Sequence, residues 1–315
     1  MKMLVRLKVL LAVCLVCCAP AFAAQKGFSQ LIIISGSLSD QGNFSSVHGD
    51  VLPPPLFVNH RSTNGPNIDD YFAEILGFPP NKPSLHLIGP VQGNNFAVFQ
   101  SLAGGHGPED LPAQIDAYLN SRGGFADPNA LHLLLISGTD VINALLNPDD
   151  RAATQILNDC VAGMETALRR LARAGAKTIF APNFTDLSTV PFAIKNGVQA
   201  RAKRISVEYR VKYEAMLNRV ERQLDIDLIR WDFFAFTQQF LPHAAQFGFT
   251  NITDSCIDFL ASGQCDPDHF LFLADFFPST RAHRFFAVAM TQAIVEHVAR
   301  RCRRDNDERF DARCE

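Results

Sequence analysis

The chain has 315 residues, of which 47% are hydrophobic and 19% are charged. This length and apolar content suit a globular protein with a sizeable core, as one large domain or two small ones. Lysine and arginine together number 29, against 32 acidic residues, so the charge balance gives no indication of a nucleic-acid-binding surface.

The first 23 residues have the pattern of an export leader. Positively charged residues precede an apolar segment, residues 9–18, that is too short to span a bilayer. An A-x-A site ends at Ala23, so we predict cleavage after this residue and a secreted or periplasmic protein. A lipid anchor on Cys17 or Cys18 is a weaker alternative, because the usual small residue does not precede either cysteine. No later stretch predicts a transmembrane helix.

An exported protein can form disulfide bonds. The cysteines outside the leader are Cys160, Cys256, Cys265, Cys302 and Cys314. We predict one bond between Cys256 and Cys265, closing a short loop, and one between Cys302 and Cys314, holding the end of the chain. Cys160 is left over within a helical pattern, so we predict a buried free thiol. No CxxC pair or Cys/His cluster indicates zinc, and the sequence predicts no metal and no cofactor.

Short apolar runs alternate along the chain with longer segments of helical periodicity. Strands are predicted at residues 31–34, 97–99, 131–136, 177–181 and 227–231. Helices are predicted at residues 68–76, 110–120, 153–173, 199–224, 234–239 and 282–300. Asn67 is expected to cap the first helix and Gly77 to end it, after a long loop over residues 41–66. The alternation predicts an α/β fold with a doubly wound, mostly parallel sheet, in one domain over residues 24–300 followed by a charged tail, residues 301–315.

Ser37 is the candidate for a chemical role that the residues themselves indicate. It follows the apolar strand at residues 31–34 and the break at Gly36, where open α/β sheets keep their ligand sites. A serine in this place can be a nucleophile if a base lies within hydrogen-bond reach. It can equally be a cap that binds the first turn of a following helix, so both interpretations stand.

The segment SLSDQGN at residues 37–43 is similar to the block GDSLSDxGN. Further blocks follow in order at residues 61–78, 95–98, 135–140, 248–256 and 272–283. Together they resemble the GDSL, or SGNH, esterases and lipases, especially the secreted bacterial phospholipase–haemolysin branch, over nearly the whole chain after the leader. The resemblance implies a three-layer α/β/α fold and a serine ester hydrolase. In that family the serine attacks, a histidine takes its proton and an aspartate three residues earlier orients the imidazole.

Carried over position by position, the resemblance keeps Ser37 as the nucleophile and loses its partners. Gly36 replaces the aspartate before the serine, Phe99 the oxyanion glycine, Thr139 the oxyanion asparagine, Ala274 the orienting aspartate and Phe277 the histidine. Loss of the base alone costs a triad enzyme on the order of 10⁴ in rate. We therefore predict a catalytically impaired or inactive relative whose apolar cleft takes a lipid, a small ester-like ligand or a protein.

An active but divergent esterase is the alternative. In it, a substitute base would serve Ser37, and the two candidates are His269 and His283. His283 lies on the terminal helix, where we expect it to make a structural hydrogen bond instead.

Overall fold

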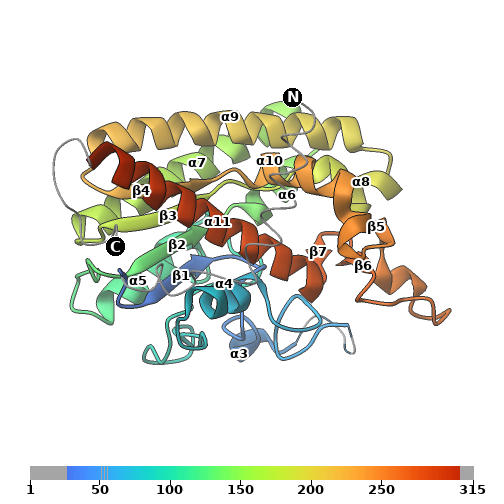
Figure 1. The fold of residues 1–315 in the computed structure, drawn as a ribbon, viewed down its shortest axis with the longest axis horizontal. Helices are drawn as coiled ribbons and strands as arrows, with labels where there is room; N and C mark the ends of the chain where they lie inside the picture. Colours follow the sequence, from blue (N-terminus) through green and yellow to red (C-terminus); the bar gives the residue numbers. More distant parts are fainter. Residues whose placement is uncertain (1–26, 51, 53, 55, 306–315) are drawn as a thin grey trace.

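The computed structural model describes residues 27–50, 52, 54 and 56–305, and its centre is a parallel sheet with the strand order β1-β2-β3-β4 (Figure 1). The strands are β1 (Leu31–Ser35), β2 (Leu131–Leu135), β3 (Thr178–Pro182) and β4 (Asp227–Trp231). All residues of β1, β2 and β3 are buried, as in a parallel sheet that is covered on both faces. The predicted leader and Cys314 lie outside the described residues.

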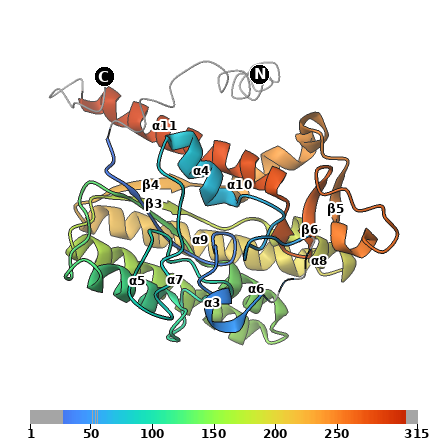
Figure 2. The same ribbon diagram turned by 90° about the horizontal axis from the view of Figure 1, so that it is seen from below.

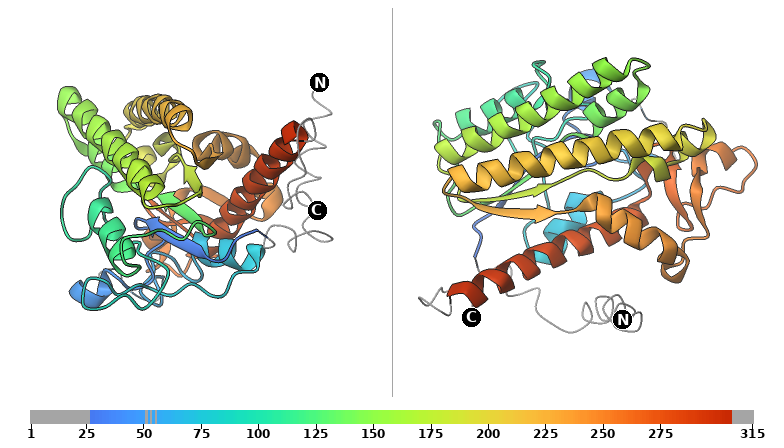
Figure 3. Two further views of the ribbon diagram at one scale, coloured as in Figure 1. Left: turned by 90° about the vertical axis from the view of Figure 1, so that its left-hand side faces the viewer. Right: turned by 90° about the horizontal axis from the view of Figure 1, so that it is seen from above.

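Helices cover the two faces of this sheet, so the predicted α/β fold is confirmed. On one face, α4 (Ile68–Leu76) packs against α11 (Thr280–Asp305); the other carries α7 (Asp150–Arg173) and α9 (Gln199–Gln223), as Figure 3 shows. The remaining helices are α3 (Ser45–His48), α5 (Leu111–Asn120), α6 (Gly138–Leu146), α8 (Pro191–Lys195) and α10 (Phe233–Phe240). The layers are therefore helix, sheet and helix, seen again from below in Figure 2.

An irregular segment, residues 94–98, lies beside β1 on the side away from β2. Three backbone hydrogen bonds join the two: Ile33 N to Asn94 O (3.0 Å), Phe96 N to Ile33 O (2.8 Å) and Val98 N to Ser35 O (3.3 Å). Only an isolated bridge at Asn95 results, so the strand predicted at residues 97–99 is wrong in bounds and regularity. After β1 the chain runs first to residues 94–98 on one side of β1, and then to β2 on its other side. The end of β1 is therefore a topological switch point, where ligands bind in open α/β sheets.

A second, small sheet follows β4 and was missed by the sequence analysis. Its strands are β5 (Asn251–Ser255), β6 (Phe270–Ala274) and β7 (Phe277–Pro278), and β7 runs antiparallel to β6. The short 3₁₀ helices of the chain are Leu187–Thr189, Leu241–Phe247 and Cys256–Phe259. The disulfide Cys256–Cys265 closes the loop between β5 and β6, as predicted.

The other sequence predictions have mixed outcomes. Cys160 is free and buried, as expected, whereas the predicted pairing of Cys302 with Cys314 falls outside what the structure describes. The terminal helix runs on to Asp305, beyond the predicted domain end at residue 300, and it begins earlier, at Thr280. Within the described residues, none of the helices is both long enough and apolar enough to cross a membrane.

One carboxyl group and one imidazole are fully buried with neither of their polar atoms hydrogen-bonded in the described part of the chain. They belong to Asp69, on α4, and His283, on α11. Burial raises the pKa of Asp69 to about 7, with Ser39 opposing the rise and Asp70 adding to it. Burial lowers the pKa of His283 to about 3. Both groups are therefore neutral in mildly acidic solution, which spares the core an unpaired charge.

These shifts predict opposite pH dependences of stability. Between pH 3.8 and about 7, the folded state holds a proton on Asp69 that the unfolded chain has lost, so Asp69 makes stability fall as pH rises. Between about pH 3 and 6.5, the unfolded chain holds a proton on His283 that the folded state lacks, so His283 makes stability rise with pH. The two effects largely cancel where the windows overlap.

Replacement of either residue should expose the contribution of the other. Relative to the parent, we expect the free energy of unfolding of Asp69→Asn to gain a slope of about +1.4 kcal/mol per pH unit, and that of His283→Leu about −1.4 kcal/mol. Urea unfolding at a series of pH values measures both slopes. Variant curves that run parallel to the parent curve would contradict these pKa assignments.

Candidate functional site

Ser37 lies in the turn directly after β1, at the carboxyl edge of the sheet. The Ser62 hydroxyl donates a hydrogen bond to the Ser37 carbonyl (2.6 Å), and the Gly36 amide donates to Leu135 O on β2 (3.3 Å). The serine is therefore fixed to the end of the neighbouring strand and to the loop before α4. No helix begins within this turn, since α3 starts only at Ser45, so the helix-cap interpretation of Ser37 is wrong.

The Ser37 hydroxyl is engaged by a backbone amide from a distant part of the chain. Gln100 N donates to Ser37 Oγ at 2.9 Å. Gln100 reaches this position with φ of 62°, a left-handed conformation that costs a non-glycine residue on the order of 1 kcal/mol. Among the described residues, no histidine or carboxylate hydrogen-bonds to Ser37 Oγ.

The carboxylate of Asp40 organises the backbone around this serine. It accepts hydrogen bonds from the amides of Gly42 (2.8 Å), Asn43 (2.8 Å), Phe44 (3.1 Å) and Phe99 (2.8 Å). Burial raises the pKa of Asp40, and these amides oppose the rise because they stabilise the ionised form. The Phe99 amide, which stands at the expected oxyanion position, is therefore already committed to Asp40.

Aromatic rings occupy the space beside Ser37. Phe99 and Phe277 stack with their centroids 5.7 Å apart and an angle of 27° between their planes. Phe44 and Phe99 contact each other edge to face with ring centroids 5.3 Å apart, and Phe57 and Phe277 do so with centroids 6.1 Å apart. The two positions where the resemblance expects the oxyanion glycine and the histidine are thus in mutual contact and apolar.

A cavity of about 640 Å³ opens beside these rings. Gly36, Ser37, Phe99, Thr139 and Phe277 all line it, so the fold brings together five of the six positions that the resemblance singles out. Thr139 enters from the first turn of α6, whereas Ala274, at the end of β6, is not among the lining residues. Most of the wall is apolar, which suits hydrocarbon better than a strongly polar ligand.

Neither histidine predicted as a substitute base lines this cavity. His269 is half-exposed and pairs with Asp266, Nδ1 to Oδ2 at 2.7 Å. The prediction that His283 makes a structural hydrogen bond is wrong, because neither ring nitrogen has a partner among the described residues. The ring centroids of His283 and Phe286 lie 6.2 Å apart.

The sequence analysis missed three other histidine–carboxylate pairs, of which His297–Asp227 lies at the opposite edge of the sheet. His60 Nδ1 lies 2.7 Å from Asp50 Oδ1, and His48 Nε2 lies 2.5 Å from Glu109 Oε1. His60 and Asp50 line a neighbouring cavity of about 330 Å³ that shares the wall residues Leu52 and Phe99 with the Ser37 cavity. No spacing in the sequence signals either pair, because His60 and Asp50 lie in an irregular loop and His48 and Glu109 are far apart in the chain.

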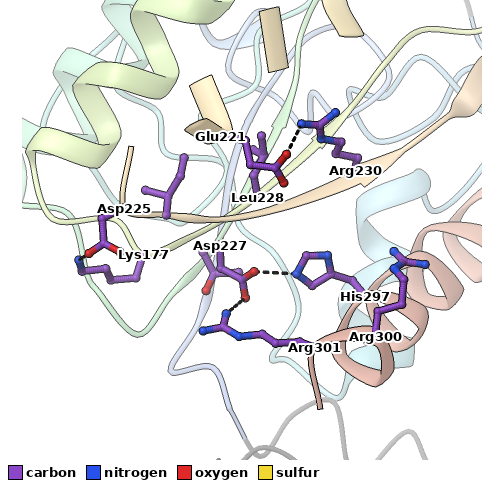
Figure 4. A pocket seen from close by; sticks show the side chains of 11 residues that line it. Lys177, Glu221, Asp225, Asp227, Leu228, Arg230, His297, Arg300 and Arg301 are labelled. Atoms are coloured by element: carbon purple, nitrogen blue, oxygen red, sulfur yellow. Dashed lines mark hydrogen bonds and ion pairs between the residues drawn. The ribbon is translucent and has the colours of Figure 1, made fainter. Parts of the chain in front are cut away.

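A third cavity, of about 630 Å³, lies at the opposite edge of the sheet, where β3 and β4 begin (Figure 4). Most of its charged side chains pair with one another: Asp227 accepts from both His297 and Arg301 (2.6 Å each), and Lys177 pairs with Asp225 (2.9 Å). This internal pairing leaves the cavity poorly suited to a charged ligand. In the part of the chain that the structure describes, no group of three or more His, Cys, Asp or Glu is placed to hold a metal.

Comparison with protein-family models finds no match. Over 272 residues the chain is 25% identical to an uncharacterised protein in the trpE–trpG intergenic region of Pseudomonas putida, covering 76% of this chain and 42% of that protein. Over 177 residues it is 26% identical to Lipase 1 of Photorhabdus luminescens, covering 54% of this chain and 24% of the lipase. The chain thus spans less than half the length of either relative. Its similarity to the lipase is distant and partial.

The role of Asp40 predicts a large effect on stability. Asp40→Ala would leave three buried amides and one part-buried amide without their acceptor, so we expect the free energy of unfolding to fall by about 3–5 kcal/mol. Asp50→Ala is the matched control, since it removes an exposed carboxylate from the following loop and should cost less than about 1 kcal/mol. Chemical unfolding measures both. A similar, small loss in the two variants would show that Asp40 does not organise the site.

Proposed function

We propose that this chain is an exported protein of the GDSL, or SGNH, hydrolase type whose site binds an acyl chain and hydrolyses esters poorly or not at all. The observation that carries the proposal is the stacked pair Phe99 and Phe277 beside Ser37, whose hydroxyl accepts a hydrogen bond from Gln100 N. A binding module of this kind keeps the cavity of a lipolytic enzyme and lacks its reacting groups.

Three properties of the site support weak or absent catalysis. A serine nucleophile needs a base that takes its proton, and the site offers Ser37 none among the described residues. The Gln100 amide withdraws electron density from Ser37 Oγ, and the Phe99 amide serves Asp40 rather than a developing oxyanion. Loss of the base costs on the order of 10⁴ in rate, and loss of one oxyanion donor costs about 10²–10³ more.

The cavity supports the binding of a hydrocarbon chain. Its volume of about 640 Å³ lies within the usual range of small-molecule sites, and leucine, isoleucine and phenylalanine side chains form most of its wall. Burial of each methylene group there stabilises the complex by about 0.8 kcal/mol. The polar residues of the wall, Ser37, Gln100 and Thr139 among them, can hydrogen-bond to a carboxylate or ester end.

Export and the extent of the domain belong to the same proposal. The leader pattern favours export, and the disulfide Cys256–Cys265 is compatible with an oxidising compartment. One domain over residues 24–300 agrees with a main core that includes both β1 and α11.

Ester hydrolysis tests the proposal directly. With short- and long-chain p-nitrophenyl esters, we expect the purified protein and Ser37→Ala to give the same background rate, because Ser37 lacks a base. Both should bind a saturated fatty acid, as measured by displacement of a fluorescent apolar dye. Turnover far above background that is lost in Ser37→Ala would contradict the proposal and establish a serine esterase.

That second candidate, a divergent esterase, is favoured by one observation. The pair His60–Asp50 has the donor–carboxylate arrangement of an oriented base, and it lies in the cavity next to that of Ser37. If turnover depends on Ser37, His60→Ala and His48→Ala are the informative variants, ahead of the buried His283 and of His269, which pairs with Asp266.

A further inference from the structure

A small inner cavity continues the Ser37 cavity towards the core. It has a volume of about 30 Å³ and shares four wall residues with the outer cavity: Leu38, Ile142, Phe184 and Phe276. Its inner wall is formed by apolar side chains, including Leu187, Val190, Phe233, Phe240, Leu271 and Phe286. The two spaces therefore lie in series, with the wider one at Ser37 and the narrower one behind Phe184 and Phe276.

The inner cavity is suited to hydrocarbon rather than water. Its two hydroxyl-bearing wall residues satisfy each other, since Thr237 Oγ1 donates to Phe233 O (2.8 Å) and lies 2.8 Å from Thr185 Oγ1. A water molecule needs two or more polar partners to occupy a buried site, and this wall leaves it none that is unpaired. A space of this size has room for the end of an unbranched chain only.

Two aromatic rings stand where the cavities meet, and each is supported from behind. The Phe184 ring lies against the start of α6, where a Cβ atom on Gly138 would come within 2.9 Å of two ring carbons. Because Gly138 has no Cβ atom, the Phe184 ring fits against the start of α6. Phe276 stacks on Phe192, with centroids 4.9 Å apart and an angle of 27° between the planes.

We propose that Phe184 and Phe276 form a gate that sets the length of the acyl chain the protein accepts, with the terminal methyl group in the inner cavity. The inference rests on the proposed function, because it assumes that the outer cavity takes an acyl chain. It adds the ligand class: a single, straight, saturated chain whose polar end stays near Ser37.

The gate predicts that affinity rises with the chain length of the fatty acid up to a limiting length and then stops rising. We call this limiting length the break. Each methylene that enters the apolar space raises affinity about fourfold. This gain ends at the length that fills the space up to the inner wall. Phe184→Ala removes a ring from the wall that the two cavities share and so enlarges the apolar space, which should let the gain continue to longer chains. Phe184→Trp narrows the passage to the inner cavity and should end the gain at shorter chains.

Competition between anilinonaphthalene sulfonate and a series of saturated fatty acids, from octanoate to octadecanoate, measures this break. Phe276→Ala is a second opening variant, for use if Phe184→Ala does not fold. The matched control is Phe259→Ala, which removes a partly buried ring that packs on Phe270 and lines neither cavity. Thermal unfolding confirms that each variant is folded.

The expected result is a break that moves to longer chains in Phe184→Ala, to shorter chains in Phe184→Trp, and not at all in Phe259→Ala. A parent protein that binds these acids with the same break in every variant would overturn the gate and leave the proposed function intact. Failure of the parent to bind any of the acids would overturn both.

Discussion

The structure of the site depends on one buried carboxylate. Asp40 binds three amides of its own turn and the amide of Phe99, so it holds the end of β1 to the segment that runs beside it. A carboxylate can accept this many donors because each of its two oxygens has two lone pairs. The ionised form is costly to bury, and the amides offset that cost. Together with the hydrogen bond from Gln100 N to Ser37 Oγ, this interaction fixes Phe99 and Gln100 relative to Ser37.

Two more aspartates extend the same arrangement along the loop that follows Phe99. Asp110 accepts the amide of Leu102 (2.8 Å), and Asp140 accepts the amides of Ala103 (2.8 Å) and Gly104 (3.1 Å). Burial raises the pKa of Asp140 to about 6, with the same amides opposing the rise. Carboxylates thus accept the backbone amide hydrogen bonds of this irregular loop, as neighbouring strands do within the sheet. The loop places Gln100 next to Ser37 in a strained conformation.

Local sequence signals predicted much of the fold. The helix at Ile68–Leu76 has the expected bounds, because Asn67 accepts two amides at its start and Gly77 takes a left-handed φ of 77° at its end. The four central strands were recognisable as short apolar runs between helices. The small sheet was not, since β5 is polar and half-exposed, and its partner strand, which begins at Phe270, is separated from it by the disulfide-closed loop.

The candidate site was predictable in its positions and not in its interactions. Similar blocks in order placed Ser37, Phe99, Thr139 and Phe277, and all four line one cavity. The hydrogen bond from Gln100 joins residues 63 apart in the chain and depends on a left-handed backbone that no glycine signals. The pair His60–Asp50 likewise arises from loop geometry, with Asn59 and His60 both at positive φ.

The central claim is that Ser37 is held among aromatic rings without a base that activates it. The most direct measurement is mass spectrometry of the protein after incubation with a fluorophosphonate, which phosphonylates activated serine nucleophiles. We predict no adduct on Ser37, because nothing in the described site takes its proton. Stoichiometric labelling of Ser37 that is absent from Ser37→Ala would contradict the account and show a working nucleophile.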